Sequence, residues 1–75
     1  MLKILFYNSS QKYFTQFEPF PNFEANQKIE EARTFAESDP DICGWTVYEQ
    51  VGGEWLPYRP FNRYIRYDKY RRNVS

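Results

Sequence analysis

The stretch "GWTVYEQVGGEWLPY", Gly44 to Tyr58, consists of two runs of alternating residues on either side of a glycine pair. Such alternation is typical of β-strands, and Gly52-Gly53 tolerates the positive φ angles that a tight hairpin turn requires. A two-residue loop would place Gln50 opposite Trp55, whereas a three-residue loop would move Trp55 to the other face of the sheet. We adopt the two-residue register, so this stretch predicts an antiparallel hairpin.

A second hairpin is predicted at the N-terminus. The segment "LKILFYN", Leu2 to Asn8, alternates in the way expected of a strand with both faces at least partly covered. After a turn at "SSQ", the ring-rich segment "KYFTQFE", Lys12 to Glu18, should pair back as its partner. Pro19 and Pro21 end that strand, because proline cannot donate to a β-ladder.

Between the hairpins, "NFEANQKIEEARTFAESDP" predicts one helix. We expect Asn22 to cap its start, Asp39-Pro40 to stop it, and Glu24 to pair with Lys28 one turn later. Its apolar positions recur at steps of four, three and four residues, at Ala25, Ile29, Ala32 and Ala36. Alanines on the inner side imply that the helix lies close to a sheet.

These elements predict an α+β domain of ββαββ order, a four-stranded antiparallel sheet with one helix packed on one face. Residues 1–58 would form the core, and residues 59–75 a basic aromatic C-terminal segment of the same single domain, as a short helix or arm. A single helix leaves the second sheet face without a cover. The residues expected to form an apolar patch there are Leu5, Tyr7, Tyr48 and Trp55.

Aromatic residues dominate the composition. The chain has 75 residues, with seven Phe, seven Tyr and two Trp. A domain of this size cannot enclose all of these rings, and exposed Tyr and Trp side chains supply stiff contact area at interfaces. The alternative is that the rings only cap the edges of the core. Large cofactor sites usually need a wider scaffold, with pockets of about 300 Å³ or more, so a nucleotide-binding enzyme fold is not expected.

The charges are unevenly distributed along a chain of zero formal net charge. Residues 1–58 carry four bases against nine acids, and residues 59–75 carry six bases against Asp68 alone. The basic end therefore either meets an acidic partner or folds back on its own acidic body.

Several kinds of chemistry have no support in the sequence. The chain has no His, so the usual proton shuttle at neutral pH is missing, and we predict that it is not an enzyme and uses no cofactor. One Cys and no His fit no common zinc site, and Asp39-Pro40-Asp41 lacks the ligand spacing of a calcium loop, so no metal is expected. Cys43, unable to form an internal disulfide, is interpreted as a small buried hydrophobe.

The expected location is cytoplasmic. The apolar run of "MLKILFYNSS" is far too short for a signal peptide or a membrane span, and a lone cysteine suits a reducing compartment. We therefore predict no contact with a membrane.

The segment "RPFNRYIRYDKYRRN", Arg59 to Asn73, has a ring at every third position with a base beside each ring. A step of three residues matches neither a helix nor a strand, so it does not sort rings and bases into separate stripes. We expect an extended lead through Pro60 and Phe61, followed by a short helix that is capped by Asn62 and turns Tyr64 and Ile65 inward. On a purely structural interpretation this helix docks on the acidic body.

Protein binding is the leading functional hypothesis, because Tyr, Trp and Arg dominate binding hot spots. The chain would inhibit or redirect a partner protein, with rings filling apolar pockets and arginines meeting carboxylates at the rim. The predicted partner-binding residues are Tyr48, Trp55, Tyr58, Arg59, Arg63, Tyr64, Arg66, Tyr67 and Tyr70. The general character of the chain, ring-rich hairpins around one acidic helix, is similar to that of small accessory proteins of bacteriophages, many of which bind a host protein.

Three alternatives remain open. Single-stranded RNA or DNA could stack its bases on the tyrosines of the C-terminal segment and place its phosphates against the arginines. The acidic helix could imitate the phosphate spacing of a nucleic acid, although a solvated helix face explains its charges more simply. Self-association could cover the exposed sheet face. Salt dependence separates nucleic-acid binding from the others, because phosphate contacts release counterions.

Overall fold

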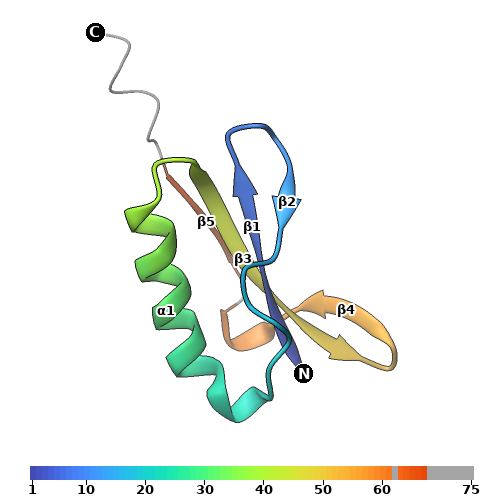
Figure 1. Ribbon diagram of the computed structural model, residues 1–75. Helices are drawn as coiled ribbons and strands as arrows, with labels where there is room; N and C mark the ends of the chain where they lie inside the picture. The colour runs from blue at the N-terminus through green and yellow to red at the C-terminus, as the bar shows by residue number, and fades with distance from the viewer. Residues whose placement is uncertain (62, 68–75) are drawn as a thin grey trace, which may run out of the picture.

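The structure is a computed structural model, and it describes residues 1–61 and 63–67. Two hairpins flank one α-helix, and a last strand follows the second hairpin (Figure 1). The elements are β1 (Leu2–Asn8), β2 (Tyr13–Phe14), the 3-10 turn η1 (Asn22–Glu24), α1 (Ala25–Ser38), β3 (Ile42–Val51), β4 (Glu54–Pro57), the 3-10 turn η2 (Arg59–Phe61) and β5 (Tyr64–Arg66).

The predicted fold class, an antiparallel sheet with one helix against it, is confirmed. The strand order is β2-β1-β3-β4, and β5 also pairs with β3. The two-residue hairpin register is correct, since Gln50 faces Trp55 across β3 and β4. Gly52 and Gly53 both have positive φ angles, of 57° and 84°, as such a turn requires.

The short C-terminal helix expected after Phe61 was a wrong prediction for the described residues. The chain instead makes the turn η2 and the strand β5, whose Ile65 lies opposite Trp45 on β3. The reason is that β3 is ten residues long and β4 pairs only with its C-terminal end, so β5 pairs with the remainder of the same edge. Asn62, the predicted cap, lies outside the described residues.

The N-terminal hairpin forms as predicted, but its second strand is only Tyr13–Phe14, shorter than the expected Lys12–Glu18. The side-chain oxygen of Asn8 accepts hydrogen bonds from two backbone N–H groups of the turn, at 3.0 and 3.1 Å. Beyond Phe14, the ring of Phe17 contacts the rings of Phe6 and Phe35. These contacts lie on the helix side of the sheet, so the chain leaves the β-ladder to make them.

Helix α1 ends at Ser38, where Asp39-Pro40 was expected to stop it, but its start differs from the prediction. The side chain of Asn22 makes no cap. Its amide instead donates to Glu49 Oε2 at 2.9 Å, and its Oδ1 accepts a hydrogen bond from the N-terminal amino group at 3.2 Å. Asn22 therefore ties the entry of the helix to β3 and to the chain end.

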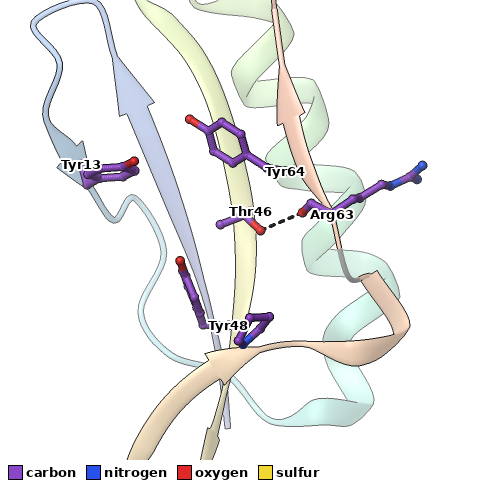
Figure 2. A pocket seen from close by; sticks show the side chains of 6 residues that line it. Tyr13, Thr46, Tyr48, Arg63 and Tyr64 are labelled. Atoms are coloured by element: carbon purple, nitrogen blue, oxygen red, sulfur yellow. Dashed lines mark hydrogen bonds between the residues drawn. The ribbon is translucent and has the colours of Figure 1, made fainter.

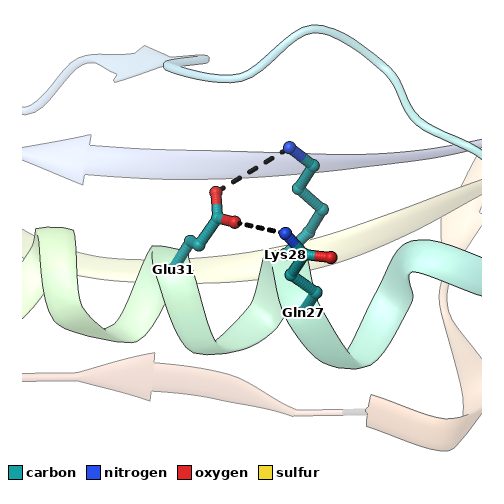
Figure 3. A network of polar contacts seen from close by, with 3 residues as sticks. All are labelled: Gln27, Lys28 and Glu31. Carbon is teal, nitrogen blue, oxygen red and sulfur yellow. Dashed lines mark hydrogen bonds and ion pairs between the residues drawn. The ribbon is translucent and has the colours of Figure 1, made fainter.

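The predicted ion pair between Glu24 and Lys28 does not form. Lys28 Nζ lies 3.8 Å from Glu31 Oε1, and the Gln27 side-chain amide donates to Glu31 Oε2 at 3.1 Å (Figure 3). The side chains of Lys28 and Glu31 are both partly exposed, and such pairs contribute little to stability. Glu31 is thus engaged within its own helix.

The core lies between α1 and one face of the sheet. Its fully buried centre is Trp45, whose ring stacks on Phe61 at 5.1 Å and whose Nε1–H donates to the Tyr67 hydroxyl at 3.0 Å. Cys43, expected to be buried, is half-buried. The other buried core residues are Leu2, Ile4, Phe6, Phe20, Ala25, Ala32, Ala36, Ile42 and Val47. In the stretch 1–61 and 63–67, no helix is long and apolar enough to cross a membrane.

Candidate functional site on the open sheet face

Strand alternation defines the face of the sheet that points away from α1. On β1, Leu2, Ile4 and Phe6 are buried in the core, so the residues between them point to the opposite side. The pairing registers extend this assignment to every strand. We call the following strand positions the open face: Lys3, Leu5, Tyr7, Tyr13, Gly44, Thr46, Tyr48, Gln50, Trp55, Pro57, Tyr64 and Arg66.

The open face carries bases and no carboxylate. Lys3 and Arg66 are its charged residues, whereas the strand acids Glu49 and Glu54 belong to the opposite face by alternation. The acids of α1 also lie on that opposite side, because the helix packs there. The helix side therefore carries both acids and bases, among them Lys28 and Arg33 of α1, whereas the described open face carries bases only, which the charge distribution along the sequence did not reveal.

A hollow of about 360 Å³ opens on this face. Its lining residues are Tyr13, Thr46, Tyr48, Pro57, Arg63 and Tyr64. Figure 2 shows the rings of Tyr13, Tyr48 and Tyr64 around one shared space, toward which the hydroxyl groups of Tyr13 and Tyr48 point, whereas the Tyr64 hydroxyl lies over Gly44. The hollow therefore combines ring-lined walls with hydroxyl groups that can donate hydrogen bonds.

Two contacts fix the wall formed by β5. Thr46 Oγ1 donates to the Arg63 carbonyl oxygen at 2.8 Å, and Tyr64 lies across the buried Gly44. Burial, and then the neighbouring phenol of Tyr13, raise the pKa of Tyr64 above its ordinary value of 10.0, although the nearby Arg66 partly opposes this. Tyr64 is therefore a neutral hydrogen-bond donor at physiological pH.

The remaining rings of the open face pack on neighbours. Lys3 Nζ lies 4.5 Å from the centre of the Trp55 ring, in a cation–π contact. The rings of Tyr7 and Tyr13 lie 5.1 Å apart with a tilt of 49°. The cation–π contact occupies one face of the Trp55 ring, and the tilted contact holds Tyr7 and Tyr13 side by side.

The structure brings together four of the predicted partner-binding residues, since Tyr48, Trp55, Tyr64 and Arg66 all belong to the open face. Arg63 borders the hollow, but its guanidinium lies over the Phe61 ring at 5.3 Å and points away from the tyrosines (Figure 2).

The other predicted residues lie elsewhere. Tyr58 and Tyr67 are half-buried against the core, and Tyr67 accepts the hydrogen bond of Trp45. Arg59 is exposed in η2 and does not belong to the open face. Tyr70 lies outside the described residues.

Sequence reasoning missed Lys3, Tyr13 and Thr46 as site residues. Tyr13 pairs directly with Tyr7, so the register of the first hairpin carried the signal that could have placed it. Thr46 and Lys3 follow from alternation once Tyr48 and Tyr7 are assigned to this face.

A second hollow, of about 420 Å³, lies on the helix side and has the opposite charge. The rings of Phe17 and Phe35 line it together with the carboxylates of Glu30 and Glu31. Within residues 1–61 and 63–67, no cluster of acidic or cysteine side chains could hold a metal ion.

Comparison of the chain with known protein families, with curated proteins and with solved structures finds no match. Function is therefore argued from the geometry of the open face.

Proposed function

We propose that this chain is a non-enzymatic binding protein that docks a partner protein on its open face and thereby inhibits or redirects it. The observation that carries the proposal is the open face itself. No described segment covers it, and it gathers the rings of Tyr7, Tyr13, Tyr48, Trp55 and Tyr64 with two bases and no carboxylate. Binding hot spots are enriched in Tyr, Trp and Arg, which are the residue types gathered here.

The arrangement of the rings favours a protein over a nucleic acid. Base stacking needs flat ring faces free to receive successive bases. Here Lys3 occupies a face of Trp55, and Tyr7 packs against Tyr13. A hollow rimmed by hydroxyl groups instead suits a protein anchor that enters it and accepts hydrogen bonds.

Single-stranded RNA or DNA is the second candidate, because of one specific observation. The carboxylates that would repel phosphates lie on the helix side of the sheet, while Lys3 and Arg66 lie on the open face. Each phosphate contact would release counterions, so nucleic-acid binding would weaken steeply with salt.

Point substitutions are the appropriate probe of this proposal. Removing residues 59–75 would also take Phe61 and β5 out of the fold, and would confuse loss of binding with loss of structure. The test variant carries Tyr13→Ala with Arg66→Glu on the open face. The matched control carries Glu30→Gln with Glu37→Gln on the exposed side of α1. Circular dichroism must show that both variants are folded.

The experiment is affinity capture from lysate of cells that express the gene, with and without nuclease treatment, followed by titration of the purified captured protein. We expect wild type and the helix variant to retain one discrete protein, and the open-face variant to bind it at least about tenfold more weakly. A protein retained equally by all three chains would refute docking on the open face. Capture that nuclease abolishes, with a steep salt slope, would establish the nucleic-acid alternative instead.

A further inference from the structure

The hollow on the open face offers a ligand two kinds of contact. Its walls are the rings of Tyr13, Tyr48 and Tyr64 together with Pro57. The three phenol hydroxyls make no hydrogen bond with any residue in 1–61 or 63–67, and those of Tyr13 and Tyr48 face the hollow (Figure 2). No carboxylate lines it. A complementary ligand is therefore apolar in bulk and rich in hydrogen-bond acceptors.

A proline-rich segment has this chemistry. Proline lacks a backbone N–H, so such a segment presents carbonyl acceptors and few donors. It also adopts the polyproline II helix without a partner, which lowers the entropy lost on binding, and this helix docks in grooves lined by aromatic rings. The phenols of Tyr13 and Tyr48 could donate to its carbonyl oxygens, while the rings of all three tyrosines contact the pyrrolidine rings.

The charges beside the hollow select the residues that flank the prolines. Arg66 lies close enough to Tyr64 to oppose the rise in the pKa of its phenol, and Lys3 pairs with Tyr48 across β1 and β3. Because no acid belongs to the described strand positions of the open face, a flanking Glu or Asp is attracted, and a flanking Lys or Arg is repelled.

We propose that the hollow binds a proline-rich segment of the partner protein that carries acidic residues at its flank. This inference rests on the proposed function, and it names the class of protein segment that the open face recognises.

The test is a nuclear magnetic resonance titration of the full chain with synthetic peptides. The probe is a run of prolines with a glutamate at each end. We expect it to shift the amide signals of Gly44 and Thr46 at saturation and to leave that of Glu37 on α1 unchanged. A peptide with alanines in place of the prolines should bind at least about tenfold more weakly. A proline peptide with lysines in place of the two glutamates should also bind at least about tenfold more weakly.

Variants separate the two kinds of contact. Tyr48→Phe keeps the ring and removes one hydroxyl, so we expect about fivefold weaker binding, the usual effect of one hydrogen bond. Arg66→Gln should weaken binding of the glutamate-flanked peptide and leave binding of a glutamine-flanked peptide unchanged. Equal affinity for the proline and alanine peptides would overturn the inference.

Failure of the inference can be distinguished from failure of the proposed function. If the captured partner still depends on Tyr13 and Arg66 while no proline peptide binds, the ligand class is wrong and protein docking stands. If a single-stranded oligonucleotide shifts the Gly44 and Thr46 signals and the proline peptide does not, both fall.

Discussion

Tyr64 lies across Gly44, so that a Cβ atom on Gly44 would stand 2.8 Å from the Tyr64 hydroxyl oxygen and 2.6 Å from the Ile65 carbonyl oxygen. Both distances are well inside contact distance. The close approach of β5 to β3 therefore requires glycine at position 44. Because Tyr64 is one wall of the hollow, the same glycine also shapes the proposed binding site.

Gly44→Ala is expected to lower the free energy of unfolding by about 1 to 3 kcal/mol, the usual cost of overpacking. Urea denaturation measures this change. Gln50→Ala, an exposed substitution on the same strand and face, is the control and should change stability by less than about 0.5 kcal/mol. Unchanged stability of Gly44→Ala would show that β5 does not lie as described.

Phe61→Ala is expected to cost about 3 to 5 kcal/mol, because the side chain is 8% exposed and stacks on Trp45. In a domain of this size such a loss removes much of the total stability. Phe23→Ala is the matched control, since Phe23 is 85% exposed and its loss should be nearly neutral. Equal effects of the two substitutions, measured by denaturation, would exclude η2 from the core.

Ionisation of Tyr64 should require a higher pH than that of a free tyrosine, because burial raises its pKa above 10.0. The folded state therefore favours the protonated phenol. This contribution to stability is fully present below pH 10.0 and is lost as pH rises through the folded-state pKa. The phenolate absorbance of wild type minus that of Tyr64→Phe isolates this group, and a difference curve centred below pH 10.0 would contradict the prediction.

Trp55 and Leu56 are neighbours on β4 that point to opposite sides of the sheet. Trp55→Ala should weaken partner binding at least about tenfold, whereas Leu56→Ala should change it less than about twofold. Titration of the captured partner measures both. A larger effect of Leu56→Ala would place the interface on the helix side, and Trp55→Ala must first be shown to fold.

The hairpins and the helix could be predicted because their signals are local. The tight turn between β3 and β4 requires positive φ angles, which Gly52 and Gly53 adopt without strain, and Asp39-Pro40 is incompatible with a continuing helix. Leu5, Tyr7, Tyr48 and Trp55 were correctly expected on the uncovered face, because strand alternation fixes the direction of each side chain.

The remaining features depend on contacts between distant residues, which no local pattern contains. The strand β5 forms because β3 extends beyond β4, a contact that the three residues of β5 do not themselves reveal. The role of Asn22 depends on Glu49, 27 positions away. The absence of acids from the described open face likewise appears only when the registers of the strands are known.

The shortness of β5 has a thermodynamic consequence. Three residues form this strand, and the backbone bond from the Tyr67 N–H to the Cys43 carbonyl closes its end at 2.8 Å. Short edge strands open locally more readily than the rest of a domain. A ligand that binds only the closed arrangement must slow amide exchange in β5, and a substitution that loosens β5 weakens binding in proportion to the fraction of molecules in which β5 stays closed. Affinity and local opening are thus two readings of one equilibrium.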